Sequence, residues 1–245
     1  MKRHIPNLLT LLNLACGTAA LVLSLEGQWH WAVYLLLAAS VLDFLDGFAA
    51  RLLRAYSETG KQLDSLADMV SFGLVPAIFI YMIFKELFLH QIEGGNGFDP
   101  SLQWGVLASV SIVPALSAIR LARFNVHAGE GEGDFFHGLP TPAHALFWTG
   151  IFWQFMDNGT LFGNPLNLYF LWAIMLIMAF QMILPVPMYS LKFAHFRLRG
   201  NLIRYLLVVL ALAILLLTGL PGLSLVILMY ILLSLLNLLI GVRVS

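Results

Sequence analysis

The stretch DFLDGFAARLLRAYSETGKQLDSLAD, residues 43–68, places four aspartates in a chain that is otherwise mostly apolar. Asp43 and Asp46 are three residues apart at the end of one apolar run, while Asp64 and Asp68 are four apart at the start of the next. Residues at these spacings share one face of an α-helix. Two helices joined by a short basic turn can therefore bring the four carboxylates together, and cations are needed to offset their mutual repulsion.

The composition indicates an integral membrane protein. Of the 245 residues, 60% are hydrophobic and 11% are charged, with a mean hydropathy of +0.87, whereas a soluble domain carries about 25% charged residues. The net charge is zero, so the chain lacks the basic field that favours nucleic acid, and no nucleic-acid partner is expected. We expect one membrane domain over residues 1–245.

The apolar segments predict an all-α, polytopic bundle. A membrane-spanning helix needs about 20 largely apolar residues, and eight segments come near that length, with uncertain boundaries. They cover residues 5–25, 30–51, 64–85, 102–123, 142–157, 165–184, 202–218 and 221–241. Pro76 and Pro114 fall inside two of them and are expected to kink their helices.

The basic residues predict the orientation of the bundle. With eight spans, twelve of the thirteen Lys and Arg residues fall on one side and only Lys85 falls on the other. Cytoplasmic loops are enriched in Lys and Arg. We therefore expect both termini and residues 43–68 at the cytoplasmic face of the cell membrane.

The aspartates suggest metal-dependent phosphate chemistry. Carboxylates without neighbouring His or Cys ligands suit Mg²⁺ or Mn²⁺, with Ca²⁺ as a further candidate, and a pair of ions would neutralise Asp43, Asp46, Asp64 and Asp68. Two such ions can polarise a pyrophosphate, while one carboxylate acts as a general base toward a hydroxyl. Asp68 is the expected base because it ends the series.

Residues around the aspartates suggest how a phosphate-rich ligand would approach. Gly47, with Ala50 one turn beyond, leaves a bare helix surface, and Arg51 can bind a phosphate in bidentate fashion. Gly60 is expected to let the chain turn before the second helix. Asn7 and Thr10, with Asn13, recur one turn apart on a buried helix and need partners, which are either other helices or the nucleotide and lipid headgroup.

Intramembrane acids also occur in proton or cation pathways, so a cation-coupled transporter is the alternative of a different class. Against it, the acids lie at span ends beside Arg51, Arg54 and Lys61 rather than at the bilayer midplane. A conduction path would also have no use for Gly47 or Gly60.

The fixed positions resemble the signature of the CDP-alcohol phosphatidyltransferase family. They read Asp43-x2-Asp46-Gly47-x2-Ala50-Arg51-x8-Gly60-x3-Asp64-x3-Asp68. The resemblance implies a membrane enzyme that joins a CDP-activated lipid or alcohol to a second alcohol and releases CMP. It also implies that the first three aspartates bind metal, that the last is a ligand or base, and that a homodimer often forms.

Four further stretches, residues 5–17, 71–77, 120–125 and 136–143, resemble the phosphatidylserine synthase branch of that family. This implies transfer of the phosphatidyl group from CDP-diacylglycerol to L-serine. The alternative keeps the chemistry with glycerol 3-phosphate or inositol phosphate as acceptor, which would call for a more basic pocket.

The acceptor site is expected to involve Arg120, Arg123, Asn125 and Gly138. Arg120 and Arg123 share a helix face beside the acids, where a phosphate or an amino-acid carboxylate would fit between them and the metals. Their alternative role is that of cytoplasmic charges that snorkel to the membrane surface. The acidic, glycine-rich loop of residues 129–138 is either a mobile cover or an ordinary solvated loop.

Overall fold

The computed structural model describes residues 4–93, 100–127, 135–158, 167–189 and 202–240. The N-terminal half contains α1 (His4–Leu25), α2 (Trp29–Leu52), α3 (Glu58–Asp68), the π-helical segment η1 (Met69–Leu74), α4 (Val75–Glu93), α5 (Pro100–Ser109) and α6 (Ile112–His127). The remainder contains β1 (Phe135–His137), α7 (Thr141–Asn158), α8 (Asn167–Gln181), β2 (Pro187–Tyr189), α9 (Leu202–Thr218) and α10 (Gly222–Ile240).

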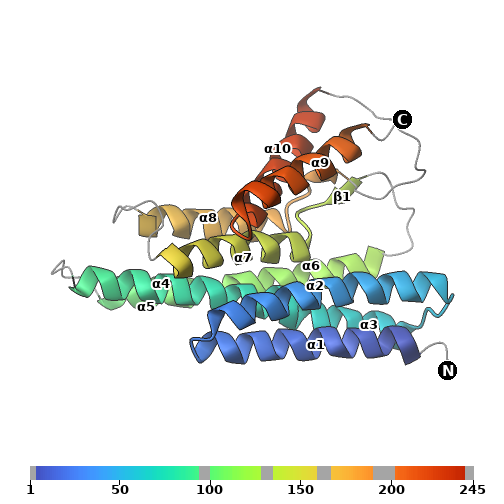
Figure 1. The fold of residues 1–245 in the computed structure, drawn as a ribbon, viewed down its shortest axis with the longest axis horizontal. Helices are drawn as coiled ribbons and strands as arrows, with labels where there is room; N and C mark the ends of the chain where they lie inside the picture. Colours follow the sequence, from blue (N-terminus) through green and yellow to red (C-terminus); the bar gives the residue numbers. More distant parts are fainter. Residues whose placement is uncertain (1–3, 94–99, 128–134, 159–166, 190–201, 241–245) are drawn as a thin grey trace.

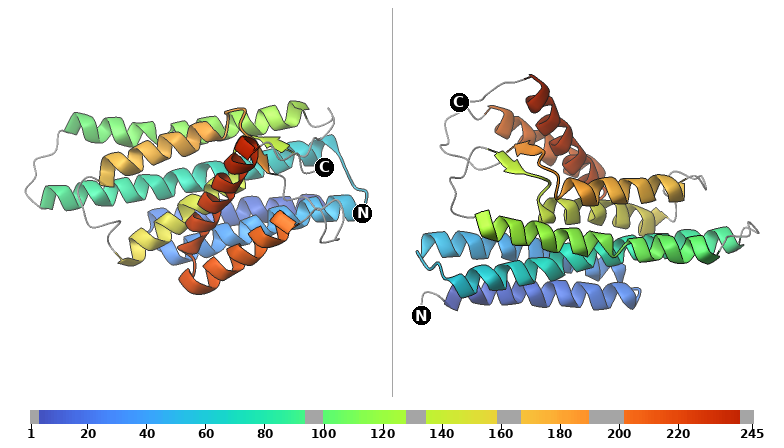
Figure 2. Two further views of the ribbon diagram at one scale, coloured as in Figure 1. Left: turned by 90° about the horizontal axis from the view of Figure 1, so that it is seen from above. Right: turned by 180° about the vertical axis from the view of Figure 1, so that it is seen from behind.

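The helices form a layered bundle (Figures 1 and 2). Helices α1 to α6 run along the long axis, α7 and α8 lie over them, and α9 and α10 are inclined across α7. The end of α2, the start of α3 and the end of α6 lie together at one end of the bundle, away from the C-terminal half of α4. That common end carries the aspartate stretch.

Each predicted span corresponds to a helix or to consecutive helices, and the chain is a polytopic membrane protein. Four stretches of the described chain are long and apolar enough to cross a membrane: His4–Leu25, Trp29–Leu52, Glu58–Leu89 and Gln103–Val126. Helices α8, α9 and α10 contain shorter apolar stretches. Helix α7 belongs to neither group among the described residues, so a count of eight crossings stays a prediction.

The two span prolines lie where the α-helix is interrupted. Pro76 follows the π segment, in which the Val75 N–H bonds to the Val70 carbonyl, five residues back. Pro114 lies in the first turn of α6, after a break that divides the predicted 102–123 span into α5 and α6. A first-turn proline costs no helical hydrogen bond, so the break removes the conflict that Pro114 would create in a continuous helix.

A short two-stranded ladder adds to the predicted all-α fold. Strands β1 and β2 pair antiparallel, with Phe136 opposite Met188. Beside them, the Gly138 N–H donates to the Val186 carbonyl at 2.8 Å. Gly138 has a φ of +78°, and a Cβ there would overlap the Met182 carbonyl. Three-residue strands carry too little periodicity to be predicted from sequence.

Packing between α7 and its neighbours holds the C-terminal layer in place. Phe79 of α4 and Phe152 of α7 stack with ring centroids 4.1 Å apart. A side chain at Gly150 would overlap Ser224 of α10, whose hydroxyl donates to the Phe147 carbonyl at 2.8 Å. Such small-residue contacts are typical of helix packing in membranes.

Candidate active site

The turn between α2 and α3 sets the separation of the two aspartate pairs. Helix α2 ends in a Schellman motif, in which the Ala55 N–H bonds to the Ala50 carbonyl at 2.9 Å and the Arg54 N–H to the Arg51 carbonyl at 3.2 Å. Arg54 occupies the left-handed position with a φ of +50°, where glycine is usual. The short basic turn predicted from the sequence is therefore confirmed.

Gly60 corrects one expectation, because it is the third residue of α3 rather than a turn. Its N–H donates to the Oγ of Ser57, the N-cap of α3, at 3.0 Å. A Cβ at Gly60 would lie 2.9 Å from Ser57 Oγ and 3.0 Å from Asn7 Oδ1. Gly60 is thus needed for close contact with α1, and a role in phosphate binding stays a prediction.

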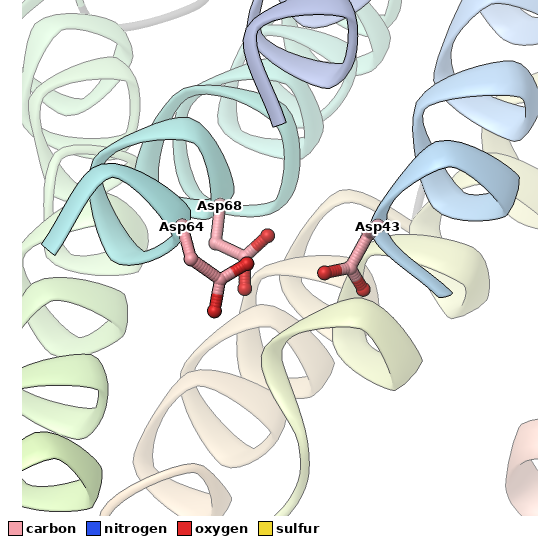
Figure 3. Close-up of side chains that lie close together, drawn as sticks. All are labelled: Asp43, Asp64 and Asp68. Carbon is pink, nitrogen blue, oxygen red and sulfur yellow. The ribbon is translucent and has the colours of Figure 1, made fainter. Parts of the chain in front are cut away.

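Three carboxylates meet where α2 and α3 face each other. Asp64 and Asp68 project from α3 toward Asp43 of α2 (Figure 3), and one oxygen from each lies within 4.8 Å of the other two. Asp68 is buried with 8% of its surface exposed, and Asp43 and Asp64 are half-buried. The buried Oδ1 of Asp64 has no hydrogen-bond partner among the described residues.

Asp46 lies beside this group and not within it. Asp46 is 5% exposed, and its Oδ2 accepts a hydrogen bond of 2.6 Å from the Thr10 hydroxyl. It lies close enough to Asp43 and Asp64 to interact with both electrostatically. The role of Asp46 as a metal ligand stays a prediction. The Thr10 side chain takes part in a hydrogen bond between α1 and α2.

Asn13 is a functional candidate for which the sequence indicated only that it needs a partner. It is fully buried, and its Nδ2 lies 3.4 Å from Asp68 Oδ1 as donor. The Ser71 hydroxyl in η1 donates to Asn13 Oδ1 at 2.7 Å. The one-turn spacing of Asn7, Thr10 and Asn13 was the available signal, but it did not identify the facing residues.

The residues of the three-carboxylate group fit a hard divalent cation. All three donors are carboxylate oxygens, the ligands that Mg²⁺, Mn²⁺ and Ca²⁺ prefer. Buried polar atoms are normally satisfied, so the orphaned Oδ1 of Asp64 also favours a ligand at this point. A cation there would bring carboxylates from two different helices into one coordination sphere.

The surface of α2 next to the aspartates is open, as expected. Among the described residues, a Cβ at Gly47 would meet only Nη1 of Arg51, at 3.9 Å. Ala50 is half-buried and Arg51 is exposed. A bulky ligand could reach the helix backbone at Gly47, and Arg51 is free to approach its phosphates.

The predicted acceptor residues differ in whether their side chains already have hydrogen-bond partners within the protein. Arg120 is half-buried, its Nε has no hydrogen-bond partner among the described residues, and it lies within electrostatic range of Asp68. The exposed Arg123 donates to the Ile183 carbonyl at 3.1 Å. Asn125 Nδ2 donates to Ser65 Oγ at 2.7 Å, which ties α6 to α3.

Lys61 strengthens this tie, since its Nζ donates to the Asn125 carbonyl at 2.6 Å. Gly138 directly follows β1 and packs against the Met182 carbonyl. Of these predicted residues, Arg120 thus has the strongest case for contact with a substrate. The acidic loop predicted as a possible cover falls mostly outside the described residues, since positions 128–134 are not described.

Comparison with known proteins gives one family match. The family described as CDP-alcohol phosphatidyltransferase matches residues 3–186, well over half of the chain. The match includes all four aspartates, Asn13 and Arg120.

Individual relatives are similar over different lengths. A CDP-diacylglycerol–serine O-phosphatidyltransferase of Mycobacterium leprae is 34% identical over 152 residues, covering 60% of this chain and 46% of that protein. A protein of the same name from Helicobacter pylori is 30% identical over 223 residues, covering 89% and 84%. An archaetidylserine synthase of Methanothermobacter thermautotrophicus is 34% identical over 144 residues, covering 58% and 54%. The chain thus spans about half the length of the mycobacterial and archaeal relatives.

Proposed function

The chain belongs to the CDP-alcohol phosphatidyltransferase family, and from that premise we propose that it transfers the phosphatidyl group of CDP-diacylglycerol to L-serine. The products are phosphatidylserine and CMP. The observation that carries the proposal is the group of three carboxylates from α2 and α3 within 4.8 Å. It combines the donors for a divalent cation with a base candidate.

Asp68 is the proposed general base. In the reaction, the serine hydroxyl oxygen forms a bond to the phosphorus that bears the diacylglycerol, and the bond from that phosphorus to the CMP oxygen breaks. The serine proton passes to Asp68, a step that requires a carboxylate within hydrogen-bond reach of the hydroxyl. Asp68 suits this role because it is the most buried member of the group and interacts electrostatically with the acceptor candidate Arg120.

Asp43, Asp64 and Asp68 are the proposed metal ligands, with Asp46 as a fourth. A divalent cation, Mg²⁺ or Mn²⁺ with Ca²⁺ as a further candidate, supplies charge neutralisation for the pyrophosphate and for departing CMP. We propose two ions, since four carboxylates serve the site. Turnover is then expected to stop in EDTA and to return when Mg²⁺ or Mn²⁺ is restored.

L-serine is the proposed acceptor for two reasons. The three relatives described above all have names that contain serine. On the structural side, Arg120 Nε has no hydrogen-bond partner within the described part of the chain, and its guanidinium interacts electrostatically with Asp68, where it can pair with the acceptor's carboxylate. Gly47, Ala50 and Arg51, with Asn7 and Thr10 on α1, are proposed to border the nucleotide and its phosphates.

An acceptor assay tests this proposal. Purified protein receives CDP-diacylglycerol and Mn²⁺ with radiolabelled L-serine, glycerol 3-phosphate or inositol phosphate. Serine-dependent CMP release with label in the lipid is expected. Incorporation of label into lipid from glycerol 3-phosphate or inositol phosphate, but not from serine, would show that serine is not the acceptor. No CMP release with any acceptor, together with ion-dependent uptake in vesicles, would favour a transporter.

The location of the site is also proposed. Five of the described basic residues lie toward the same end as the aspartates: Arg51 and Arg54 where α2 ends, Lys61 where α3 begins, and Arg120 and Arg123 in the second half of α6. The enrichment of basic residues on the cytoplasmic side supports a cytoplasmic active site in the cell membrane, where soluble serine arrives. A homodimer within membrane lipids is the proposed assembly.

A further inference from the structure

A buried chain of hydrogen bonds connects α1 and η1 to Asp68. The Ser71 hydroxyl donates to Asn13 Oδ1 at 2.7 Å, and Asn13 Nδ2 donates to Asp68 Oδ1 at 3.4 Å. Asn13 and Ser71 are both fully buried. The carboxylate at the end of this chain is therefore held from a helix that contributes no acid of its own.

The direction of this chain is determined by the chemistry of its members. An amide side chain has one accepting and one donating end, and a serine hydroxyl has a single proton to donate. Because the Asp68 carboxylate accepts hydrogen bonds and has none to donate, the amino end of Asn13 is the end that faces Asp68, and Asn13 Oδ1 is left to accept from the Ser71 hydroxyl. A water molecule or a freely rotating side chain would not impose this orientation.

The backbone packing fixes Ser71 in place. A Cβ at Gly17 would overlap Ser71 Oγ, so the absence of a side chain at Gly17 allows η1 to pack closely against α1 beside Ser71. Ser71 lies within the π segment and three residues after Asp68, and both side chains meet Asn13. The hydroxyl also lies 3.2 Å from the Asn13 carbonyl, which anchors it to the same turn of α1.

We propose that Asn13 is a positioning residue for Asp68, and that Ser71 acts through Asn13 by fixing its amide. This inference rests on the proposed role of Asp68. The amide donor of Asn13 contacts one oxygen of Asp68, and this fixes the orientation in which the carboxylate faces the other metal ligands and the substrate hydroxyl. Groups that orient a reacting side chain in this way typically change activity by about 10- to 100-fold when removed.

The test is a double-mutant cycle with Asn13→Ala, Ser71→Ala and the double variant, using CMP release from CDP-diacylglycerol and serine. Asn13→Ala is expected to lower kcat by about 10- to 100-fold and to leave KM for both substrates within about 2-fold. Ser71→Ala is expected to lower kcat by about 5-fold, the effect of one lost hydrogen bond. The double variant should match Asn13→Ala alone, because Ser71 acts only through Asn13.

Ser24→Ala is the matched control. Ser24 is fully buried on α1, and its hydroxyl donates to the Ala20 carbonyl of its own helix at 2.7 Å. Its removal should leave kcat unchanged. Calorimetric titration with CDP and Mg²⁺ provides a readout besides activity, and the variants should bind CDP within about 2-fold of the wild type.

The outcomes distinguish this inference from the proposed function. No CMP release by the wild type with serine would refute the proposed function. An active wild type with unchanged kcat in Asn13→Ala, or additive losses in the double variant, would refute the positioning role. If Asn13→Ala fails to fold, Ser71→Ala still decides, since a kcat equal to that of the wild type would overturn the proposal.

Discussion

Replacing Asp64 by asparagine should stabilise the protein without metal and remove most of its stabilisation by metal. Asp64 has carboxylate neighbours on Asp43 and Asp68 within 4.8 Å. At an effective dielectric constant of about 20, two unit charges at that distance repel by about 3 kcal/mol. Solvent reaches the half-buried Asp43 and Asp64 and reduces this repulsion, so we expect a net gain of about 1 to 3 kcal/mol in EDTA.

With metal bound, Asp64→Asn should have the opposite effect on stability. A cation present at about 100 times its Kd stabilises a protein by about 2.7 kcal/mol, and Asp64→Asn removes one of the four proposed carboxylate ligands. Thermal unfolding in detergent micelles, followed by the fluorescence of the six tryptophans, measures both effects at pH 8. One kcal/mol corresponds to about 2 to 4 °C in a chain of this size.

Asp157→Asn makes the same chemical change on an exposed residue near the end of α7. It should shift the melting temperature little, both in EDTA and in Mn²⁺. The contrary result is an Asp64→Asn variant that melts lower than the wild type in EDTA and still gains as much stability from Mn²⁺. That result would mean that the three carboxylates neither repel one another nor hold the ion.

Three other substitutions test separate parts of the site. Asp68→Asn should abolish CMP release and spare most CDP binding, and turnover near the wild-type rate would remove Asp68 as the base. Gly17→Ala should lower the melting temperature by several degrees because its Cβ would overlap Ser71 Oγ. Gly105→Ala should be tolerated, since no described residue lies within 4 Å of a Cβ at that position. Arg54→Gly should raise stability by about 1 kcal/mol by relieving the left-handed backbone, and an equal or lower melting temperature would contradict this.

The local features of the site follow from the sequence. The spacing of Asp43 with Asp46, and of Asp64 with Asp68, places each pair on one helical face because helix geometry repeats every 3.6 residues. The apolar runs likewise predict the helices, since their length and composition are properties of contiguous residues. The basic turn between α2 and α3 was predicted on the same grounds.

Contacts between helices were decided by the tertiary structure. The spacing of the four aspartates does not indicate which of them meet most closely, but the fold gathers Asp43, Asp64 and Asp68 and turns Asp46 toward Thr10. The spacing of Asn13 indicated only that it needed a partner, and the offset of α1 against η1 supplies Asp68 and Ser71. Rotation and offset of packed helices depend on side chains far apart in the chain, so a periodic pattern along one helix does not contain them.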